Sequence, residues 1–328
     1  MSEMRYDDIL GKLVIIPSKS SEINGKCPYC LGNENLDKPV IVALVSDGNI
    51  LKKVYEHTES RDWKVRVFES EKPIVAISNG KVSNENDIAY GYHYVLALTP
   101  DHQSPCKLPI DQWINILLIL QDTIKLLYTK KGVSYVAVYM NNMKNSHPHI
   151  DIITFSKIPP AIEKEAESIN RSTIDNGTCP ICKLTNDSSE RSIFEYKNFI
   201  AICPWSSKHE YEFMIIPKRH LSHFVSLTQK DINELALVMR VTLGGLYNTL
   251  QHSNTSNHDE FNLIFHLPPE KKQNKQFHWY IDVYPINKIQ NVLASEFDIH
   301  INELKPEEAT VELSKAARRE FADLMGIR

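Results

Sequence analysis

The sequence predicts an α+β protein built from two copies of one unit, because the same order of features occurs twice along its 328 residues. Each copy begins with a Cys-Pro-x-Cys pair, at 27–30 and at 179–182. Strand-like segments, a strand followed by a histidine, a helical segment and a further strand come next. Each copy ends in the pattern His-x-(His or Tyr)-Ile-Asp-(Ile or Val), at 147–152 and 278–283. An order shared over so many features indicates an internal duplication.

The first copy contains several strand-like segments and one long helical segment. Apolar runs rich in β-branched and aromatic residues predict strands at 14–16, 63–68, 73–77, 92–98 and 133–140. Pro109 opens a strongly apolar segment that runs to about Lys131, and proline suits the first turn of a helix. We therefore expect one helix between the fourth and fifth of these strands.

The second copy repeats this order after a polar segment at 156–178 that carries two adjacent prolines. This segment is predicted to be a helical or irregular connector. A strand ends at Pro217 to His220, and a helix capped by Thr228 runs to about Leu250. A strand follows at 261–265, and a final helix begins at Pro306.

These segments divide the chain into three parts. The first half is predicted at 1–158, the connector at 159–178 and the second half at 179–328. The chain is long enough for two domains of ordinary size, each with its own core.

Composition excludes several classes of protein. Apolar residues make up 42% and charged residues 24% of the chain, as in an ordinary soluble globular protein. The net charge of −4 provides no general attraction for nucleic acid or for an acidic membrane. No apolar run reaches the ~18 residues that a membrane span needs, and the polar N-terminus is not a signal peptide. We therefore expect a cytoplasmic protein whose closely spaced cysteines bind metal rather than form disulfides.

The strand at 147–152 is the strongest site candidate. Side chains alternate faces along a strand, so His147, His149 and Asp151 share one face while Ile150 and Ile152 share the other. Two imidazoles and a carboxylate on an otherwise apolar strand indicate a functional site, since buried polar groups need partners. The alternative is an edge strand that shows its polar face to water. The recurrence of the pattern in the second copy favours the site.

Each copy also supplies two cysteines and two histidines, a set that fills a tetrahedral zinc ion and leaves no open position. The predicted ligands are Cys27, Cys30, His102 and His147 in the first half and Cys179, Cys182, His220 and His278 in the second. A closed site of this kind holds the cysteine loop to the sheet and does not activate water. His223 is an alternative to His220, and a redox pair is the alternative for either cysteine motif alone.

This assignment leaves His149 free, two residues after a metal ligand. A neutral imidazole is a competent nucleophile near pH 7. The equivalent residue in the second half is Tyr280, whose phenol has an ordinary pKa of ~10 and is a poor nucleophile. The sequence therefore predicts one reactive half and one structural half.

Taken together, these motifs resemble the galactose-1-phosphate uridylyltransferase class of the histidine-triad (HIT-like) superfamily, closest to its two-zinc ADP-glucose phosphorylase-type members. The resemblance covers nearly the whole chain and is carried by Arg5 to Pro17, Cys27 to Cys30, Trp63 to Val67, Pro100 to His102, His147 to His149, Cys179 to Cys182, Ile216 to His220, His278-Trp279 and Pro306 to Ala309. It implies two open-faced antiparallel sheets with flanking helices, one per half, related by a pseudo-twofold axis.

The resemblance also implies an activity. The histidine matching His149 attacks the α-phosphate of a nucleoside diphosphate sugar, sugar 1-phosphate leaves, and the nucleotide passes to a second phosphate acceptor. Ser146, Asn145 and Lys144 are the residues that would contact the phosphate. Arg66 and Ser70 fall in the family's base-binding segment. The family is often dimeric, so a homodimer is an expectation, with no role for nucleic acid or membrane.

Three departures from the family pattern bear on the chemistry, and one of them is Ser70, which stands where the family has an asparagine in its base-binding segment. Asp151 stands where the family has a glutamine that donates a hydrogen bond to the phosphate, and an ionised carboxylate cannot donate. Either Asp151 is protonated, or a cation or basic side chain neutralises it, or the site runs another reaction. The loop at 141–146 also lacks the usual glycines. The alternatives are a hydrolase or phosphorylase in which Asp151 assists, and a non-catalytic zinc-stabilised nucleotide-binding protein.

Overall fold

The structure is a computed structural model of the chain. It describes residues 2–17, 27–33, 40–47, 50–55, 62–76, 89–187, 190–252, 259–269, 276–286 and 292–327.

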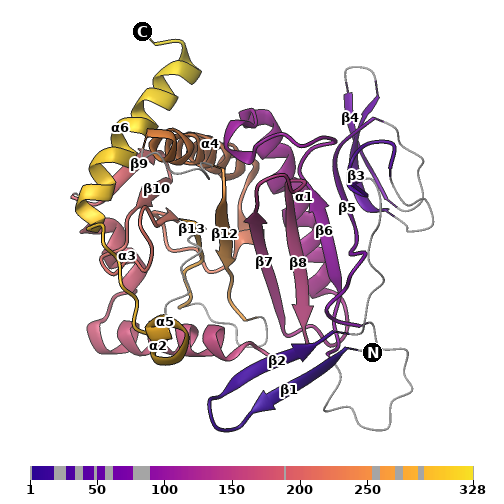
Figure 1. Ribbon diagram of the computed structural model, residues 1–328, viewed down its shortest axis with the longest axis horizontal. Helices are drawn as coiled ribbons and strands as arrows, with labels where there is room; N and C mark the ends of the chain where they lie inside the picture. The colour runs from indigo at the N-terminus through magenta and orange to yellow at the C-terminus, as the bar shows by residue number, and fades with distance from the viewer. Residues whose placement is uncertain are drawn as a thin grey trace.

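An 11-stranded antiparallel sheet forms the centre of the molecule (Figure 1). Its strands, in the order in which they lie side by side, are β4 (Ile50–Val54), β3 (Val40–Asp47), β5 (Trp63–Glu69), β6 (His93–Ala97), β8 (His149–Phe155), β7 (Tyr135–Asn142), β12 (Phe261–His266), β13 (Tyr280–Pro285), β11 (Phe213–Pro217), β10 (Phe199–Ile202) and β9 (Ser192–Tyr196). The strand order is consistent with two equivalent halves, because β6-β8-β7 on one side of the centre mirrors β12-β13-β11 on the other.

The two halves meet at the β7–β12 pair. The register runs from Asn142 opposite Phe261 to Val138 opposite Phe265, so the hydrogen bonding continues without a break across the centre. The resemblance implied one antiparallel sheet per half, and the structure shows these two sheets joined edge to edge. Joining them removes an exposed edge from each half, which protects against unwanted strand pairing.

Helices cover one face of the sheet and form the main core with it. Helix α1 (Ile110–Tyr128) packs against first-half strands, and α4 (Gln229–His252) packs against β9 and β10. The other helical segments are η1 (Pro105–Lys107), α2 (Pro160–Asn176), α3 (Pro180–Asn186), η2 (Phe224–Ser226), α5 (Val292–Phe297) and α6 (Pro306–Met325). Within the described ranges, no helix is long and apolar enough to cross a membrane.

Strand β8 carries the alternation that the sequence predicted. Ile150 and Ile152 are fully buried in the core on the helix side, whereas His149 and Asp151 face the other side and are half-buried. Since β6 and β7 flank β8 on both sides, the edge-strand alternative is wrong. Ile153, also on the second face, packs with the hairpin of β1 (Glu3–Asp7) and β2 (Lys12–Ile16).

The strand predicted at 73–77 is wrong over the described residues. Only an isolated bridge between Ala76 and Tyr90 forms there, and Ile77 lies outside the described residues. Pro73 has no N–H to donate to a strand partner. The N–H of Ile74 instead donates to His93 Nδ1 at 3.3 Å. The segment predicted as a connector contains helix α2, which begins at Pro160 and ends before the left-handed Gly177.

Candidate functional site

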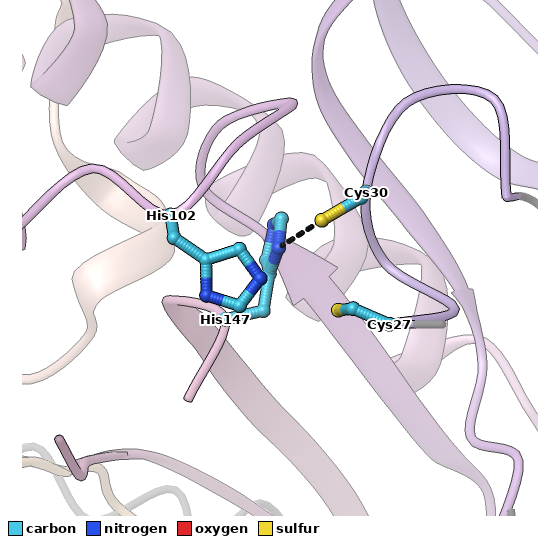
Figure 2. A group of neighbouring side chains, drawn as sticks. All are labelled: Cys27, Cys30, His102 and His147. Atoms are coloured by element: carbon cyan, nitrogen blue, oxygen red, sulfur yellow. Dashed lines mark hydrogen bonds between the residues drawn. The ribbon is translucent and has the colours of Figure 1, made fainter. Parts of the chain in front are cut away.

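Three segments of the first half bring the four predicted metal ligands together (Figure 2). Cys27 and Cys30 lie in a turn, His102 follows β6, and His147 lies two residues before β8. Their ligand atoms are all within 4.8 Å of one another, and Cys30 Sγ lies 3.6 Å from His147 Nδ1. Tetrahedral zinc with ordinary bond lengths places sulfur and nitrogen about 3.6 Å apart. The geometry therefore fits a bound metal ion.

The hydrogen bonding of His147 supports the same conclusion. Its Nε2 donates to the carbonyl oxygen of Thr99 at 2.8 Å, so the lone pair of Nδ1 faces the cysteine sulfurs. Burial lowers the pKa of His147 to about 4, which keeps the imidazole neutral, as a metal ligand must be. The Leu31 N–H donates to Pro100 O at 3.0 Å and ties the cysteine turn to the end of β6.

The second half has a matching cluster built on a helix. Cys179 precedes α3 and Cys182 lies in its first turn, while His220 follows β11 and His278 precedes β13. Cys182 Sγ lies 3.4 Å from Nδ1 of both histidines. The cluster contains His220, not the alternative His223. His278 Nε2 donates to Pro217 O at 2.8 Å, which repeats the arrangement of the first cluster.

His149 is held so that one ring nitrogen stays available. Its Nδ1 donates to the carbonyl oxygen of His147 at 2.7 Å, and its Nε2 lies 3.6 Å from Asp151 Oδ2. Burial alone would lower the pKa of His149, but the contact with Asp151 and the bond to His147 raise it above its ordinary value. Nε2 is therefore the nitrogen that could react with a ligand.

Asp151 pairs with a residue that sequence reasoning missed. Its Oδ1 accepts from His93 Nε2 at 3.0 Å, and His93 Nδ1 accepts the N–H of Ile74, so the proton of a neutral His93 lies on Nε2. Burial raises the pKa of Asp151, but the contacts with His149 and His93 outweigh it and lower the pKa to about 2. The sequence left three alternatives for Asp151. This geometry favours the one in which basic side chains neutralise the carboxylate, and it opposes the one in which Asp151 is protonated.

A second missed residue is Tyr29, between the two cysteines of the first cluster. Its ring centroid lies 5.3 Å from that of His149 and 5.9 Å from that of His147. It also lies 5.3 Å from Phe68 of β5. The metal loop therefore reaches the candidate nucleophile directly. Aromatic character within a Cys-x-x-Cys motif was the only sequence signal for this contact.

The predicted base-binding residues lie on or just after β5, which β6 separates from the strand of His149. Arg66 is buried, and the sheet register places it opposite Ala97, which is in turn opposite His149. Its guanidinium carbon lies 4.5 Å from the ring centroid of Phe68. Ser70, just after β5, is also buried, and its N–H donates to His93 O at 2.8 Å.

The predicted phosphate-contacting residues lie elsewhere around the motif. Lys144, Asn145 and Ser146 line a cavity of about 670 Å³ together with Lys107 and Tyr247. His149 is not among the lining residues. The hydroxyl of Ser146 donates to Met143 O at 2.6 Å, within its own loop. The structure thus places the loop residues around this cavity. It places His149 together with Asp151 on the sheet face instead.

The equivalent position in the second half is closed by the connector helix. Tyr280 donates its hydroxyl to Glu165 of α2 at 2.9 Å, and His266 Nδ1 lies 2.9 Å from the same carboxylate. The rings of His266 and Tyr280 stack at 4.3 Å. Asp282, the counterpart of Asp151, is buried, and burial together with the charge of Glu212 raises its pKa well above the ordinary value.

Comparisons with known proteins agree with this architecture. Residues 178–288 match the family model described as "Scavenger mRNA decapping enzyme C-term binding". The chain is 23% identical to a galactose-1-phosphate uridylyltransferase of Thermotoga maritima, over 95% of this chain and 98% of that protein. A solved uridylyltransferase structure superposes with a TM-score of 0.78 at 21% identity, covering 97% of this chain and 99% of that one.

An ADP-glucose phosphorylase from Arabidopsis thaliana, solved with bound ADP-glucose, gives a TM-score of 0.75 at 21% identity. That match covers 96% of this chain and 98% of the other. The resemblance that the sequence motifs indicated is therefore confirmed, and so is the HIT-like α+β fold.

Proposed function

We propose that this protein, which resembles galactose-1-phosphate uridylyltransferases over nearly its whole length, is a nucleotidyltransferase that uses His149 as its nucleophile. The observation that carries the proposal is the geometry of His149. Its Nδ1–H is fixed on the carbonyl oxygen of His147 at 2.7 Å, and this orients Nε2 for attack on a phosphorus atom.

The proposed substrates are a nucleoside diphosphate sugar and a sugar 1-phosphate. His149 Nε2 attacks the α-phosphorus, the bond to the bridging oxygen breaks, and sugar 1-phosphate leaves. An acceptor phosphate oxygen then attacks the same phosphorus, and the phosphorus–nitrogen bond breaks to restore the imidazole. The Nδ1–H bond to His147 O stabilises the positive charge that develops on the ring.

Other residues take supporting roles in this proposal. Arg66 and Ser70 lie near the first-half sheet face, where a base would be held beside His149. Lys144, Asn145 and Ser146 would contact the sugar phosphate from the cavity that they line. Zinc is the ion proposed for both Cys₂His₂ clusters, and when bound it supplies a structural cross-link. A homodimer and a cytoplasmic location complete the proposal.

A hydrolase or phosphorylase is the second candidate, and Asp151 is the observation that favours it. An ionised carboxylate 3.6 Å from His149 Nε2 would repel a phosphate and could accept a proton from water. Release of free nucleoside monophosphate without a phosphate acceptor would identify the hydrolase, and release of nucleoside diphosphate that requires inorganic phosphate would identify the phosphorylase.

The proposal is tested by incubating the protein with UDP-glucose, UDP-galactose or ADP-glucose, with and without inorganic phosphate or galactose 1-phosphate. Acceptor-dependent turnover that disappears in His149→Ala, while the metal content stays the same, supports a transferase. Turnover that survives in His149→Ala contradicts it. Nucleotide binding that does not change in His149→Ala, without turnover, would instead indicate a binding protein.

A further inference from the structure

We propose that Tyr29 is a positioning residue for His149, and that it couples the cysteine loop of the first metal cluster to the reactive imidazole. This inference rests on the proposed role of His149 as nucleophile. It adds a function for the first cluster beyond stabilising the fold: the cluster fixes the ring that sets the orientation of the nucleophile.

The ring of Tyr29 contacts side chains from two strands of the site, His149 of β8 and Phe68 of β5. Its centroid is 5.3 Å from that of His149 with an interplanar angle of 59°, and 5.3 Å from that of Phe68 with an angle of 53°. It approaches His147 edge-on, at 5.9 Å and 82°. Tilted and edge-to-face arrangements at these separations are favourable for aromatic pairs. Tyr29 therefore contacts the metal ligand and the nucleophile at once.

His149 needs such a contact because its hydrogen bonds fix only part of its orientation. The bond from Nδ1 to His147 O fixes one edge of the ring, at 2.7 Å. Asp151 Oδ2 lies 3.6 Å from the opposite nitrogen, beyond ordinary hydrogen-bond distance. The imidazole can still tilt about the Nδ1 bond, and the ring of Tyr29 limits that tilt. A displacement of about 1 Å in a reacting group can cost about a hundredfold in rate.

The position of Tyr29 is in turn set by its neighbours in the loop. Cys27 and Cys30 flank it within one or two residues and both belong to the metal cluster. Asn33 Nδ2 donates to Cys27 O at 3.1 Å, and Leu31 N–H donates to Pro100 O at 3.0 Å. With a metal ion joining the cysteines to His102 and His147, the loop is bound to the sheet on both sides of Tyr29.

The second half lacks this contact. Ile181 stands between the cysteines in place of Tyr29, and it is buried in the core. Tyr280, the counterpart of His149, stacks on His266 instead. The aromatic residue in the cysteine loop therefore occurs in the half that carries the nucleophile. This contrast also supplies a matched substitution, because isoleucine is accepted at the equivalent place in the same chain.

The phenol group is not needed for this role. The ring alone makes the contacts with His149, His147 and Phe68. Tyr29→Phe should therefore behave like the natural protein, whereas Tyr29→Ile should not.

The test has one readout that does not depend on activity. Histidines are labelled with ¹³C, and the ring resonance of His149 among the 13 histidines is identified by its loss in His149→Ala. A neighbouring aromatic ring shifts this resonance. We expect Tyr29→Phe to keep one sharp resonance near its natural position. In Tyr29→Ile the loss of the ring alone moves the resonance, and we expect the moved resonance also to broaden or split because the imidazole now tilts, with metal content unchanged in both variants.

The second readout is the rate at which the nucleotide adduct forms in a single turnover. We expect Tyr29→Ile to slow this step by about 10- to 100-fold, with the dissociation constant of the nucleotide sugar nearly unchanged, and Tyr29→Phe to remain within about threefold. A single sharp resonance with a normal adduct rate in Tyr29→Ile would overturn the inference, as would loss of the metal. If the natural protein forms no adduct, the proposed function fails, while the resonance still decides whether Tyr29 positions His149.

Discussion

The two halves of the sheet hold similar metal clusters but differ at the position two residues after the last histidine ligand. In the first half this residue is His149, whose Nε2 remains beside the sheet face. In the second half it is Tyr280, whose hydroxyl is bonded to Glu165 of the connector helix. The difference fits our proposal that the Cys₂His₂ clusters stabilise the architecture in both halves, and that reactivity depends on one side chain and on what covers it.

The aspartates that follow repeat this contrast. The sheet register connects Asp151 through Tyr139 and Ile264 to Asp282, so both lie on one row of the same face. Burial raises the pKa of both carboxyl groups, but contacts with His149 and His93 outweigh it and lower the pKa of Asp151 to about 2. Burial and Glu212 raise the pKa of Asp282. Equivalent carboxyl groups are thus held ionised in the first half and shifted toward the neutral form in the second half.

The largest expected difference between the halves is in turnover. His149→Ala should lower it by at least about a thousandfold, because the nucleophile is removed. Tyr280→Phe should leave it within about twofold, because the Tyr280 hydroxyl donates to Glu165 and its ring stacks on His266. Steady-state rates with the best nucleotide-sugar donor provide the measurement. Equal losses in the two variants would mean that the halves are not divided into reactive and structural roles.

Removing one ligand from each cluster separates stability from reactivity. Cys30→Ser and Cys182→Ser should each lower the metal content from two ions to one and reduce the free energy of unfolding by about 3 kcal/mol or more. At a temperature where both variants are folded, Cys30→Ser should lose about 100-fold in turnover and Cys182→Ser less than about tenfold. Metal analysis, urea unfolding and turnover test this together, and the reverse order of activities would refute it.

Asp151→Gln introduces the amide that the family resemblance leads us to expect at this position. An N–H donor aimed at the phosphate should raise the rate of nucleotidyl transfer by about 10-fold or more, since single donors of this kind contribute up to about 100- to 1,000-fold. Asp151→Asn is the control, because its amide is one carbon shorter and stops short of the phosphate. A slower transfer in Asp151→Gln than in the natural protein would show that the carboxylate itself takes part in the reaction.

The smallest expected effects are those of Asp151 and Asp282 on how the free energy of unfolding changes with pH. A carboxyl group whose folded pKa is lowered stabilises the protein above its unfolded pKa, and this contribution is lost as pH falls toward about 2. A carboxyl group whose folded pKa is raised destabilises the protein as pH rises above its unfolded value.

At pH 8, Asp151→Asn should therefore lower the free energy of unfolding, and Asp282→Asn should raise it, each by about 1–3 kcal/mol. At pH 4 the gain from Asp282→Asn should be smaller. Urea unfolding at both pH values measures the difference. Changes of the same sign in the two variants would contradict the opposite environments of the two residues.

The metal clusters could be predicted from the sequence because paired cysteines and histidines at matching places in a repeat are typical of metal ligation. The alternation of buried and half-buried side chains along β8 could also be predicted, because successive side chains of a strand point to opposite faces. The sequence indicates His149 as the candidate nucleophile because His147, on the same face of the strand, is already a predicted metal ligand. These inferences need only local spacing and the repeat.

The partners of the site could not be predicted, because they depend on strand register and on contacts between distant segments. His93 reaches Asp151 only because β6 lies beside β8, and Glu165 reaches Tyr280 only because α2 lies near the start of β13. The segment at 73–76 has a strand-like composition, but Pro73 and the bond from Ile74 to His93 prevent regular pairing. Composition carries no information about these contacts.

The central claim is that one histidine in one half carries the nucleotide. The most direct test is intact-protein mass spectrometry after incubation with UDP-glucose, UDP-galactose or ADP-glucose, with an alkaline quench because phosphohistidine adducts are labile in acid. The account predicts one nucleoside monophosphate per chain, mapped by peptide analysis to His149 and absent from His149→Ala. An adduct on another residue, or turnover without any adduct on His149, would contradict it.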